Sequence, residues 1–141
     1  MKKHYPFENA PLAYAYDALE PYIDEKTMQL HHERHLKTYI DNLNSILKKY
    51  PQFQTLTLEQ LIHTTRQVPE RDCIAIARNA SGVYNHQFFF NGMCPDGKKA
   101  PSGALAVDIN RRFGSLNAFR EKFTEMAGMF GCSMASKGFV S

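Results

Sequence analysis

Histidines at helical spacing are the residues in this sequence best suited to chemistry. Between positions 31 and 39 the sequence reads HHERHLKTY, which places His31, His35 and Tyr39 four residues apart. Four residues turn an α-helix by about 400°, so these three side chains are predicted to share one face. Leucines continue that face toward position 47, so we expect it to be the buried face. His32 is predicted to point away from it, into solvent.

Spacing alone leaves two interpretations of His31 and His35 open. Buried imidazole nitrogens need hydrogen-bond partners, so both residues could be hydrogen-bonded members of a core or an interface. Imidazole is also a common ligand of first-row transition metals, so one residue could bind a metal ion while the other supports it. A third and weaker interpretation is adventitious metal binding by positions 31, 32 and 35 together.

A further histidine, His86, stands in the aromatic stretch YNHQFFF at positions 84–90. By itself, a histidine among aromatic side chains is more often a packing residue than a metal ligand. Two long helices that each offer one inward histidine change this expectation, because helical bundles build metal sites from side chains on facing helices. Two histidines nevertheless do not complete a transition-metal site.

Two long helices are predicted to carry these histidines. Asp24 is a suitable N-cap for a helix that runs to about residue 49 and ends before Pro51. The second helix begins near Pro69, a favourable first-turn residue, and ends at Asn91 before a glycine. Between them, TLEQ at positions 57–60 has the form of a capping box that opens a short helix.

The rest of the chain is predicted to form an extended arm and further helices. Prolines at positions 6, 11 and 21 favour an extended arm over residues 5–21. Helical periodicity is present in residues 104–113 and after position 115, with Phe119, Phe123 and either Met126 or Ala127 predicted to face inward. No convincing strand alternation occurs. We therefore predict an all-α chain, with residues 1–97 as one domain and residues 98–141 as the start of another.

Length and composition exclude several classes of protein. With 141 residues, 43% apolar and 22% charged, the chain suits a single globular domain better than a disordered segment. No apolar run approaches the ~18 residues of a membrane span, and a net charge of +3 without a basic tract gives no support for nucleic-acid binding. The three cysteines form no CxxC pair, and no signal peptide follows the first residues. We expect a cytoplasmic protein with neither membrane nor nucleic-acid partners.

Several motifs in the same order resemble the iron/manganese superoxide dismutase family, from about Tyr5 to Gly131. The arm carries PLAY and DALEPYI, the first helix TMQLHH and NLN, and the second helix YNHQFFF. PSGAL at positions 101–105 and FGS at 113–115 resemble the opening of the family's second domain. Each motif alone is weak evidence, and their shared order makes the resemblance strong.

The resemblance implies roles for individual residues. His31 and His86 match the family's two metal ligands from the N-terminal domain. Tyr39 matches its gateway tyrosine, which takes part in proton delivery, and His35 a histidine that lines the substrate channel. Arg34 falls where the family has a basic residue near that channel, and positive potential there would attract a small anionic substrate.

Three more positions match the family's substrate channel. Gly82 stands where iron-type members often carry glutamine, and Phe89 where they often carry tyrosine, so both lean toward manganese-type members or members that work with either metal. Phe90 replaces the family's usual tryptophan and keeps an aromatic wall. The resemblance therefore implies one manganese or iron ion per chain.

The sequence departs from the family in its last residues. The family's third histidine and its aspartate come from a DxWEH stretch further along, and its second domain contains a three-stranded sheet. Neither is present in the 141 residues, the sequence diverges from about position 132, and no tryptophan occurs. The expected fold is a long antiparallel helical hairpin followed by the first helices of an α/β C-terminal domain whose sheet is missing. Two of the family's four protein ligands would then be absent.

The family's reaction converts two superoxide ions and two protons into dioxygen and hydrogen peroxide. With two ligands absent, we expect this chain to be an impaired dismutase. The rival hypothesis is a non-catalytic helical fragment or interaction protein, with uncovered apolar surface on residues 104–113 and 115–128. Family resemblance also implies a homo-oligomer, either a dimer or a tetramer.

Overall fold

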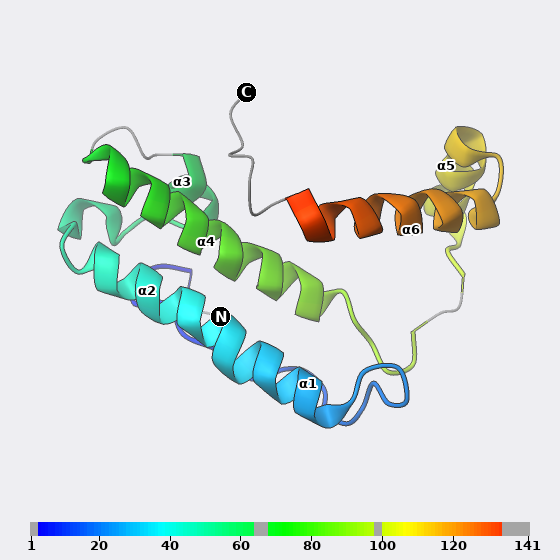
Figure 1. The fold of residues 1–141 in the computed structure, drawn as a ribbon, viewed down its shortest axis with the longest axis horizontal. Coiled ribbons are helices and arrows are strands. Elements are labelled where there is room, and N and C mark those ends of the chain that lie inside the picture. Colours follow the sequence, from blue (N-terminus) through cyan, green and yellow to red (C-terminus); the bar gives the residue numbers. More distant parts are fainter. Residues whose placement is uncertain (1–2, 64–67, 98–99, 134–141) are drawn as a thin grey trace. The chain divides into compact units, whose positions relative to one another are not determined.

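Helices form all the regular secondary structure within residues 3–63, 68–97 and 100–133, which the computed structural model describes (Figure 1). Side chains are described as far as residue 129. The contacts within the chain separate residues 1–97 from residues 98–141, so the two units are treated one at a time. The helical fold class predicted above is confirmed for the described residues. Positions 134–141 of the divergent tail lie outside them.

The first long helix is continuous but is not α-helical throughout. It consists of α1 (Glu25–Gln29), the π-helical segment η1 (Leu30–Leu36) and α2 (Lys37–Leu47). Asp24 is its N-cap as predicted, and the carboxylate accepts a hydrogen bond from the Thr27 backbone N–H at 2.9 Å. A π turn closes hydrogen bonds five residues apart and is wider than an α turn. Four-residue steps nevertheless persist across η1, since Met28, His32, Leu36 and Ile40 are all buried.

The predicted shared face of His31, His35 and Tyr39 is confirmed, because successive ring centroids lie 5.5 Å and 5.3 Å apart, but it is not the buried face of the helix. His32, predicted to point into solvent, is buried, with only 4% of its surface exposed. His35, predicted to lie on the buried face, is exposed, while His31 and Tyr39 are half-buried. The physical reason is that four residues overshoot a full α-helical turn by about 40°, so a face extended from His31 in four-residue steps drifts before it reaches Leu43 and Leu47.

The second long helix, α4 (Glu70–Asn91), packs antiparallel to α2 (Figure 1). It begins directly after Pro69, as predicted. Between α2 and α4 lie a 3₁₀ turn, η2 (Pro51–Phe53), and the short helix α3 (Leu58–His63). The predicted capping box is present: the Gln60 side chain accepts from the Thr57 N–H, and the Thr57 hydroxyl accepts from the Gln60 N–H.

Apolar side chains from α2, α3 and α4 form the core of the first unit. Leu43, Leu47, Ala80 and Val83 have no exposed surface, and Leu61 and Ile76 have 1%. Burying a leucine or valine side chain contributes about 1.5–3 kcal/mol, so this layer is the main attraction between the two long helices. It fixes the position of the histidines that they carry.

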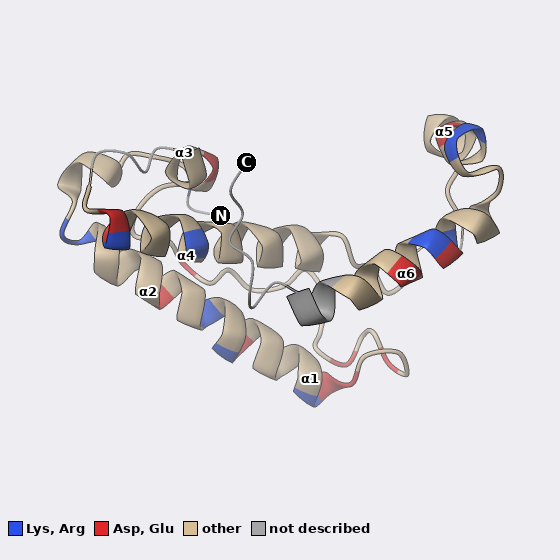
Figure 2. Cartoon of the chain, turned by 45° about the horizontal axis from the view of Figure 1, so that its top comes forward, with Lys and Arg blue, Asp and Glu red and all other residues tan. Residues whose placement is uncertain are grey.

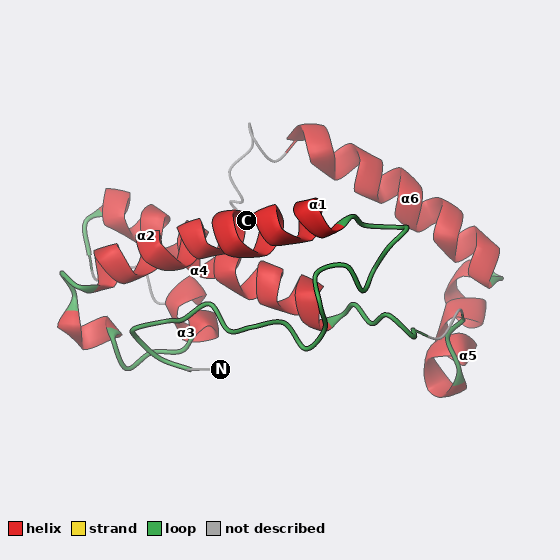
Figure 3. Cartoon of the chain, turned by 90° about the horizontal axis from the view of Figure 1, so that it is seen from below, coloured by secondary structure: helices red, strands yellow, loops and turns green. Residues whose placement is uncertain are grey.

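The N-terminal arm covers one side of the hairpin, as the loop in Figure 3 shows. Its Phe7 is 3% exposed, and its backbone is held by Asn44, whose amide donates to the Phe7 carbonyl and accepts from the Phe7 N–H. Further along, the Tyr14 hydroxyl donates to the Phe90 carbonyl at 2.9 Å. The arm is attached to both long helices. It is non-helical, but the predicted extended conformation is wrong for its second part, where successive turns occupy residues 16–22.

The second unit contains α5 (Gly103–Phe113) and α6 (Leu116–Ser133), joined at Gly114. Gly114 has a φ of 81°, a left-handed conformation that favours glycine at a helix C-terminus. Phe113 packs on Phe119 with ring centroids 5.1 Å apart. None of the helices described in either unit is long and apolar enough to cross a membrane.

The predicted inward orientation of α6 side chains is wrong for two of the three residues. Phe123 is 64% exposed and Met126 43% exposed, whereas Phe119 is half-buried. Two helices alone offer too little apolar surface to cover each other's faces on all sides. The predicted exposure of apolar surface on this unit is found, and it extends to Leu105, Val107 and Met129.

Candidate functional site

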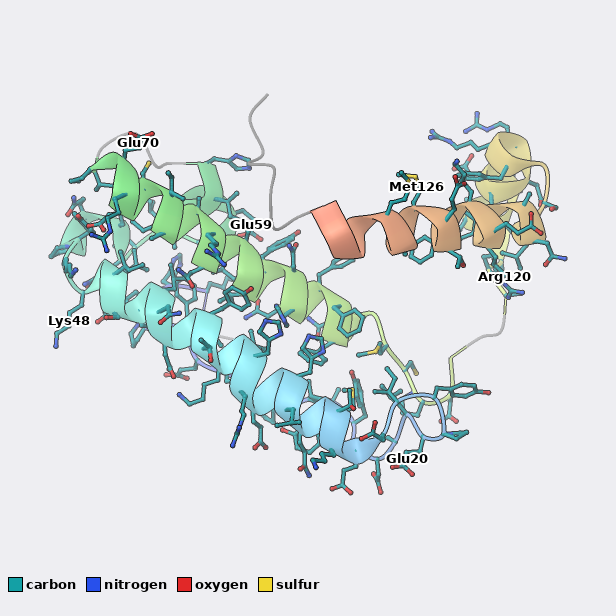
Figure 4. All side chains as sticks on the ribbon, viewed as in Figure 1. Glu20, Lys48, Glu59, Glu70, Arg120 and Met126 are labelled. Carbon is teal, nitrogen blue, oxygen red and sulfur yellow. The ribbon has the colours of Figure 1, made fainter. Side chains whose placement is uncertain are left out.

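Three histidine rings meet between η1 and α4. His31, His35 and His86 each offer one ring nitrogen, and these atoms all lie within 4.8 Å of one another. The ring centroid of His86 lies 4.9 Å from that of His31 and 4.8 Å from that of His35. Figure 4 shows side-chain rings filling the space between the two long helices at this level. Two segments more than 50 residues apart in the sequence therefore contribute to one cluster.

A backbone hydrogen bond fixes the orientation of His86. Its Nδ1 lies 2.7 Å from the carbonyl oxygen of Gly82, one turn earlier in α4. A carbonyl can only accept, so Nδ1 carries the hydrogen and Nε2 keeps its lone pair. That Nε2 lies 3.4 Å from Nδ1 of His35. A fixed tautomer with a free Nε2 is the form in which histidine binds metals, because the hydrogen bond at the other nitrogen orients the ring.

The surroundings keep His31 and His86 neutral. Burial lowers the pKa of His31, and the neighbouring His86 and His35 lower it further. Burial also lowers the pKa of His86, although its hydrogen bond to Gly82 acts in the opposite direction. Only the neutral ring has a lone pair to offer a metal ion. At neutral pH both residues are thus in the form that can bind one.

We predict that His31 and His86 titrate below the ordinary histidine value of 6.5 in the metal-free protein. In the unfolded chain they regain the ordinary value, so between the two values the unfolded state binds more protons. Their contribution to stability is therefore complete above pH 6.5 and is lost as the pH falls below it. Ring C–H resonances followed by NMR, in buffer and in urea, give both values. A folded-state value at or above the urea value would contradict the prediction.

Aromatic residues and one glycine surround the cluster. The Tyr39 ring lies 5.3 Å from the rings of both His35 and His86, measured between centroids. It also packs flat against the backbone of Gly82, where a Cβ atom would lie 2.7 Å from Cε1 and Cγ of Tyr39 and closer still to Cδ1. Glycine at this position is what allows Tyr39 to approach α4.

The two phenylalanines that end this stretch of α4 differ in exposure. Phe90 is buried, with its ring centroid 5.1 Å from that of His31. Phe89 is 45% exposed, and its ring centroid lies 5.5 Å from that of His31.

Arg34 is exposed, and its side chain does not line the groove that His35 and Tyr39 form with their neighbours. Its role near a channel therefore rests on the resemblance alone.

The hydrogen-bond network around His32 was not foreseen from the sequence. Its Nδ1 lies 2.9 Å from the Tyr16 hydroxyl, and its Nε2 lies 3.0 Å from the carbonyl oxygen of Ala10. The Tyr16 hydroxyl donates to the Glu33 carboxylate, and the Asn9 amide donates to the His32 carbonyl. His32 thus joins the arm to η1 directly beside His31. The tyrosines of the arm were the sequence feature that could have indicated this network, since a tyrosine hydroxyl that is removed from solvent needs a polar partner.

Comparisons with known proteins agree with this geometry. A family model described as "Iron/manganese superoxide dismutases, alpha-hairpin domain" matches residues 6–94, which include every histidine of the cluster. The chain belongs to the iron/manganese superoxide dismutase family. It is similar to "Superoxide dismutase [Mn] 1" of Leptolyngbya boryana, with 43% identity over 92% of this chain and 53% of that protein. It is also 40% identical to "Superoxide dismutase [Mn]" of Thermus thermophilus, over 93% of this chain and 65% of the relative.

The family match covers most of this chain but only part of each relative. "Superoxide dismutase [Mn]" of Acinetobacter baylyi gives a similar result, at 42% identity over 92% of this chain and 56% of its own length. The chain thus spans between half and two thirds of the length of these members of the family. Membership of the family follows from the match, and the activity of this chain requires a separate argument.

Proposed function

We propose that His31 and His86 bind one manganese or iron ion and that this chain serves the dismutation of superoxide. The observation that supports the proposal is the meeting of neutral histidine nitrogens from two helices, with the tautomer of His86 set by Gly82. Imidazole nitrogen is a suitable donor for both metals. Three similar proteins carry manganese in their names, which favours manganese for this chain. Gly82 and Phe89, where the family resemblance leans toward the manganese type, support the same choice.

When bound, the metal would supply one-electron chemistry by alternating between its +3 and +2 states. The chain's own residues would bring the anion and the protons. We propose that Tyr39, which contacts His35 and His86, holds and delivers a proton at its phenolic oxygen. His35 is exposed and stands at the edge of the cluster, so we assign it to the entrance used by superoxide. Phe89 and Phe90 would limit the access of water from the side of His31.

Two ligands do not hold a redox metal at a controlled potential. Coordination positions beyond those of His31 and His86 would be filled by water or by donors outside the described residues. We therefore expect the 141-residue polypeptide to be slow compared with dismutases that have a complete site. The rival proposal, a non-catalytic interaction protein, is supported by the exposed apolar side chains on α5 and α6.

The rate of superoxide loss in the manganese-loaded polypeptide, measured against free manganese, tests the dismutase proposal. We expect a rate above that of the free ion, and a return to the free-ion rate in His31→Ala and His86→Ala. His63→Ala is the matched control, because His63 is exposed on α3 and lies outside the cluster. If the unchanged polypeptide and all three variants remove superoxide only at the rate of free manganese, the dismutase proposal is wrong and the interaction-protein proposal replaces it.

We also propose a cytoplasmic location and, from the family resemblance, assembly into a dimer or tetramer. We further propose that residues 1–97 and 98–141 are two domains, with the histidines in the first. Sedimentation of the polypeptide measures the assembly state directly, and a monomer at all concentrations would contradict the proposed assembly.

A further inference from the structure

A groove with two arginines runs beside the histidine cluster between α2 and α4. It encloses about 470 Å³, within the range of small-molecule sites. The lining residues are His35, Thr38, Tyr39, Asn42, Arg71, Ile74, Ala75, Arg78 and Asn79. The lining contains two guanidinium groups, several neutral hydrogen-bonding groups and no carboxylate. A lining of this composition favours the binding of an anion.

Both arginines lie on one face of α4. Seven residues separate Arg71 from Arg78, which is close to two helical turns and a rise of about 10 Å. Figure 2 shows that the charged positions of α4 belong to its N-terminal half, whereas the half that carries His86 has none. The N-terminal half also carries Glu70 and Asp72, but of its charged residues only the two arginines line the groove.

Neither arginine forms an ion pair with another described residue. Within the described residues, the ion pairs join Lys37 to Asp41, Arg111 to Asp108 and Lys122 to Glu125. The acidic residue of α2, Asp41, is therefore held by Lys37, and Asp72 of α4 accepts a hydrogen bond from the Tyr50 hydroxyl. Asp41 and Asp72 thus have other partners, and Glu70 forms no ion pair with either arginine.

We propose that this groove binds a small oxyanion with several oxygens, of the phosphate or carboxylate class, through Arg71 and Arg78. A guanidinium group binds two oxygens of such an anion with parallel hydrogen bonds, which a diatomic anion cannot accept in the same way. The Asn42 amide and the second amide hydrogen of Asn79 supply neutral donors for the remaining oxygens, whereas the Thr38 hydroxyl already donates to the Arg34 carbonyl. The site differs from the proposed metal ligands, His31 and His86, neither of which lines the groove.

The proposal goes beyond the dismutase function and does not depend on it. Tyr39 and His35 line both the groove and the edge of the histidine cluster. A bound oxyanion would therefore lie next to the side chains assigned above to proton delivery and entry. Binding can be measured in metal-free protein, so failure of the dismutase proposal would leave this one testable.

Titration of the metal-free polypeptide with inorganic phosphate at constant ionic strength, by calorimetry and by NMR of backbone amides, tests the proposal. We expect saturable binding of one phosphate per chain, with shifted amides in residues 38–42 and 71–79. Arg71→Gln and Arg78→Gln should each weaken binding roughly tenfold, because each removes charge-assisted hydrogen bonds to the anion. The same titration with acetate establishes whether carboxylate or phosphate binds more tightly.

Lys48→Gln is the matched control, since it removes one positive charge from a residue at the end of α2 that does not line the groove (Figure 4). Its phosphate affinity should equal that of the unchanged chain. Circular dichroism of each arginine variant confirms that the helices are intact. Non-saturable binding, or equal weakening by Lys48→Gln and the two arginine variants, would reduce the effect to general attraction by net charge and overturn the proposal.

Discussion

Replacing Gly82 with alanine is expected to destabilise the first unit and to displace Tyr39. The added Cβ would lie 2.7 Å from two carbon atoms of the Tyr39 ring and closer to a third. The neighbour is a rigid ring rather than the end of a flexible side chain, so the ring or α4 has to move. Overpacking of this kind typically costs about 1–3 kcal/mol in the free energy of unfolding. Chemical unfolding followed by circular dichroism measures that loss.

Gly128→Ala is the matched control for this variant. Gly128 also lies inside a helix, α6, but an added Cβ there meets no atom within 4 Å. Alanine has a higher helix propensity than glycine by about 1 kcal/mol, so the control is expected to be neutral or stabilising. Opposite signs for the two variants would establish that Gly82 is required for the approach of Tyr39. Equal stabilisation by both would show that Tyr39 does not pack on α4 as described.

The boundaries of the helices could be predicted from the sequence because their signals are local. Asp24, the Thr57–Gln60 capping box, Pro69 and Gly92 each act within one turn of the helix end that they mark. The structure places these ends within a few residues of the predicted positions. Local hydrogen bonding and steric restriction by proline are sufficient to fix them.

Which face of the first helix is buried could not be predicted in the same way. Four-residue spacing correctly placed His31, His35 and Tyr39 together, with successive ring centroids 5.5 Å and 5.3 Å apart. Each such step overshoots a full turn by about 40°, so the face does not continue to Leu43 and Leu47. His32 is therefore buried and His35 exposed, the reverse of the prediction. π turns frequently occur at functional sites, and η1 carries two of the three clustered histidines.

The pairing of His31 with His86 was only partly accessible to sequence reasoning. Residue spacing predicted that each histidine lies on a helix, and the family resemblance predicted that the two bind the same metal ion. The hydrogen bond from His86 to the Gly82 carbonyl, and the contact of Tyr39 with Gly82, depend on how closely α2 and α4 approach. That distance is set by the buried side chains of the core, among them Leu43 and Val83, and no local pattern encodes it.

In α6 the helix itself was predicted correctly, but the burial of its apolar face was not. The apolar positions at Phe119, Phe123 and Met126 have the period of an amphipathic helix, and the helix is present. Period alone indicates which residues share a face, without indicating what covers that face. In the second unit, α5 covers the Phe119 region and leaves Phe123 and Met126 exposed.

Loss of metal binding in His86→Ala is the largest effect that we expect. Removing a residue that only supports a metal ligand typically costs 10–100-fold in affinity, so loss of a ligand itself should cost about 100-fold or more. His31→Ala should have the same effect, because the two nitrogens belong to one site. His63→Ala, on the exposed surface of α3, should leave the affinity unchanged. Circular dichroism of each variant checks that the hairpin is folded.

The most direct test of the metal site is the dissociation constant of Mn²⁺ in the polypeptide and these three variants, from the electron paramagnetic resonance signal of the free ion. The account predicts one saturable ion per chain, lost in both His31→Ala and His86→Ala and retained in His63→Ala. Retention in His86→Ala with loss only in His31→Ala would assign binding to the HHERH segment by itself. That result would contradict a site built from two helices.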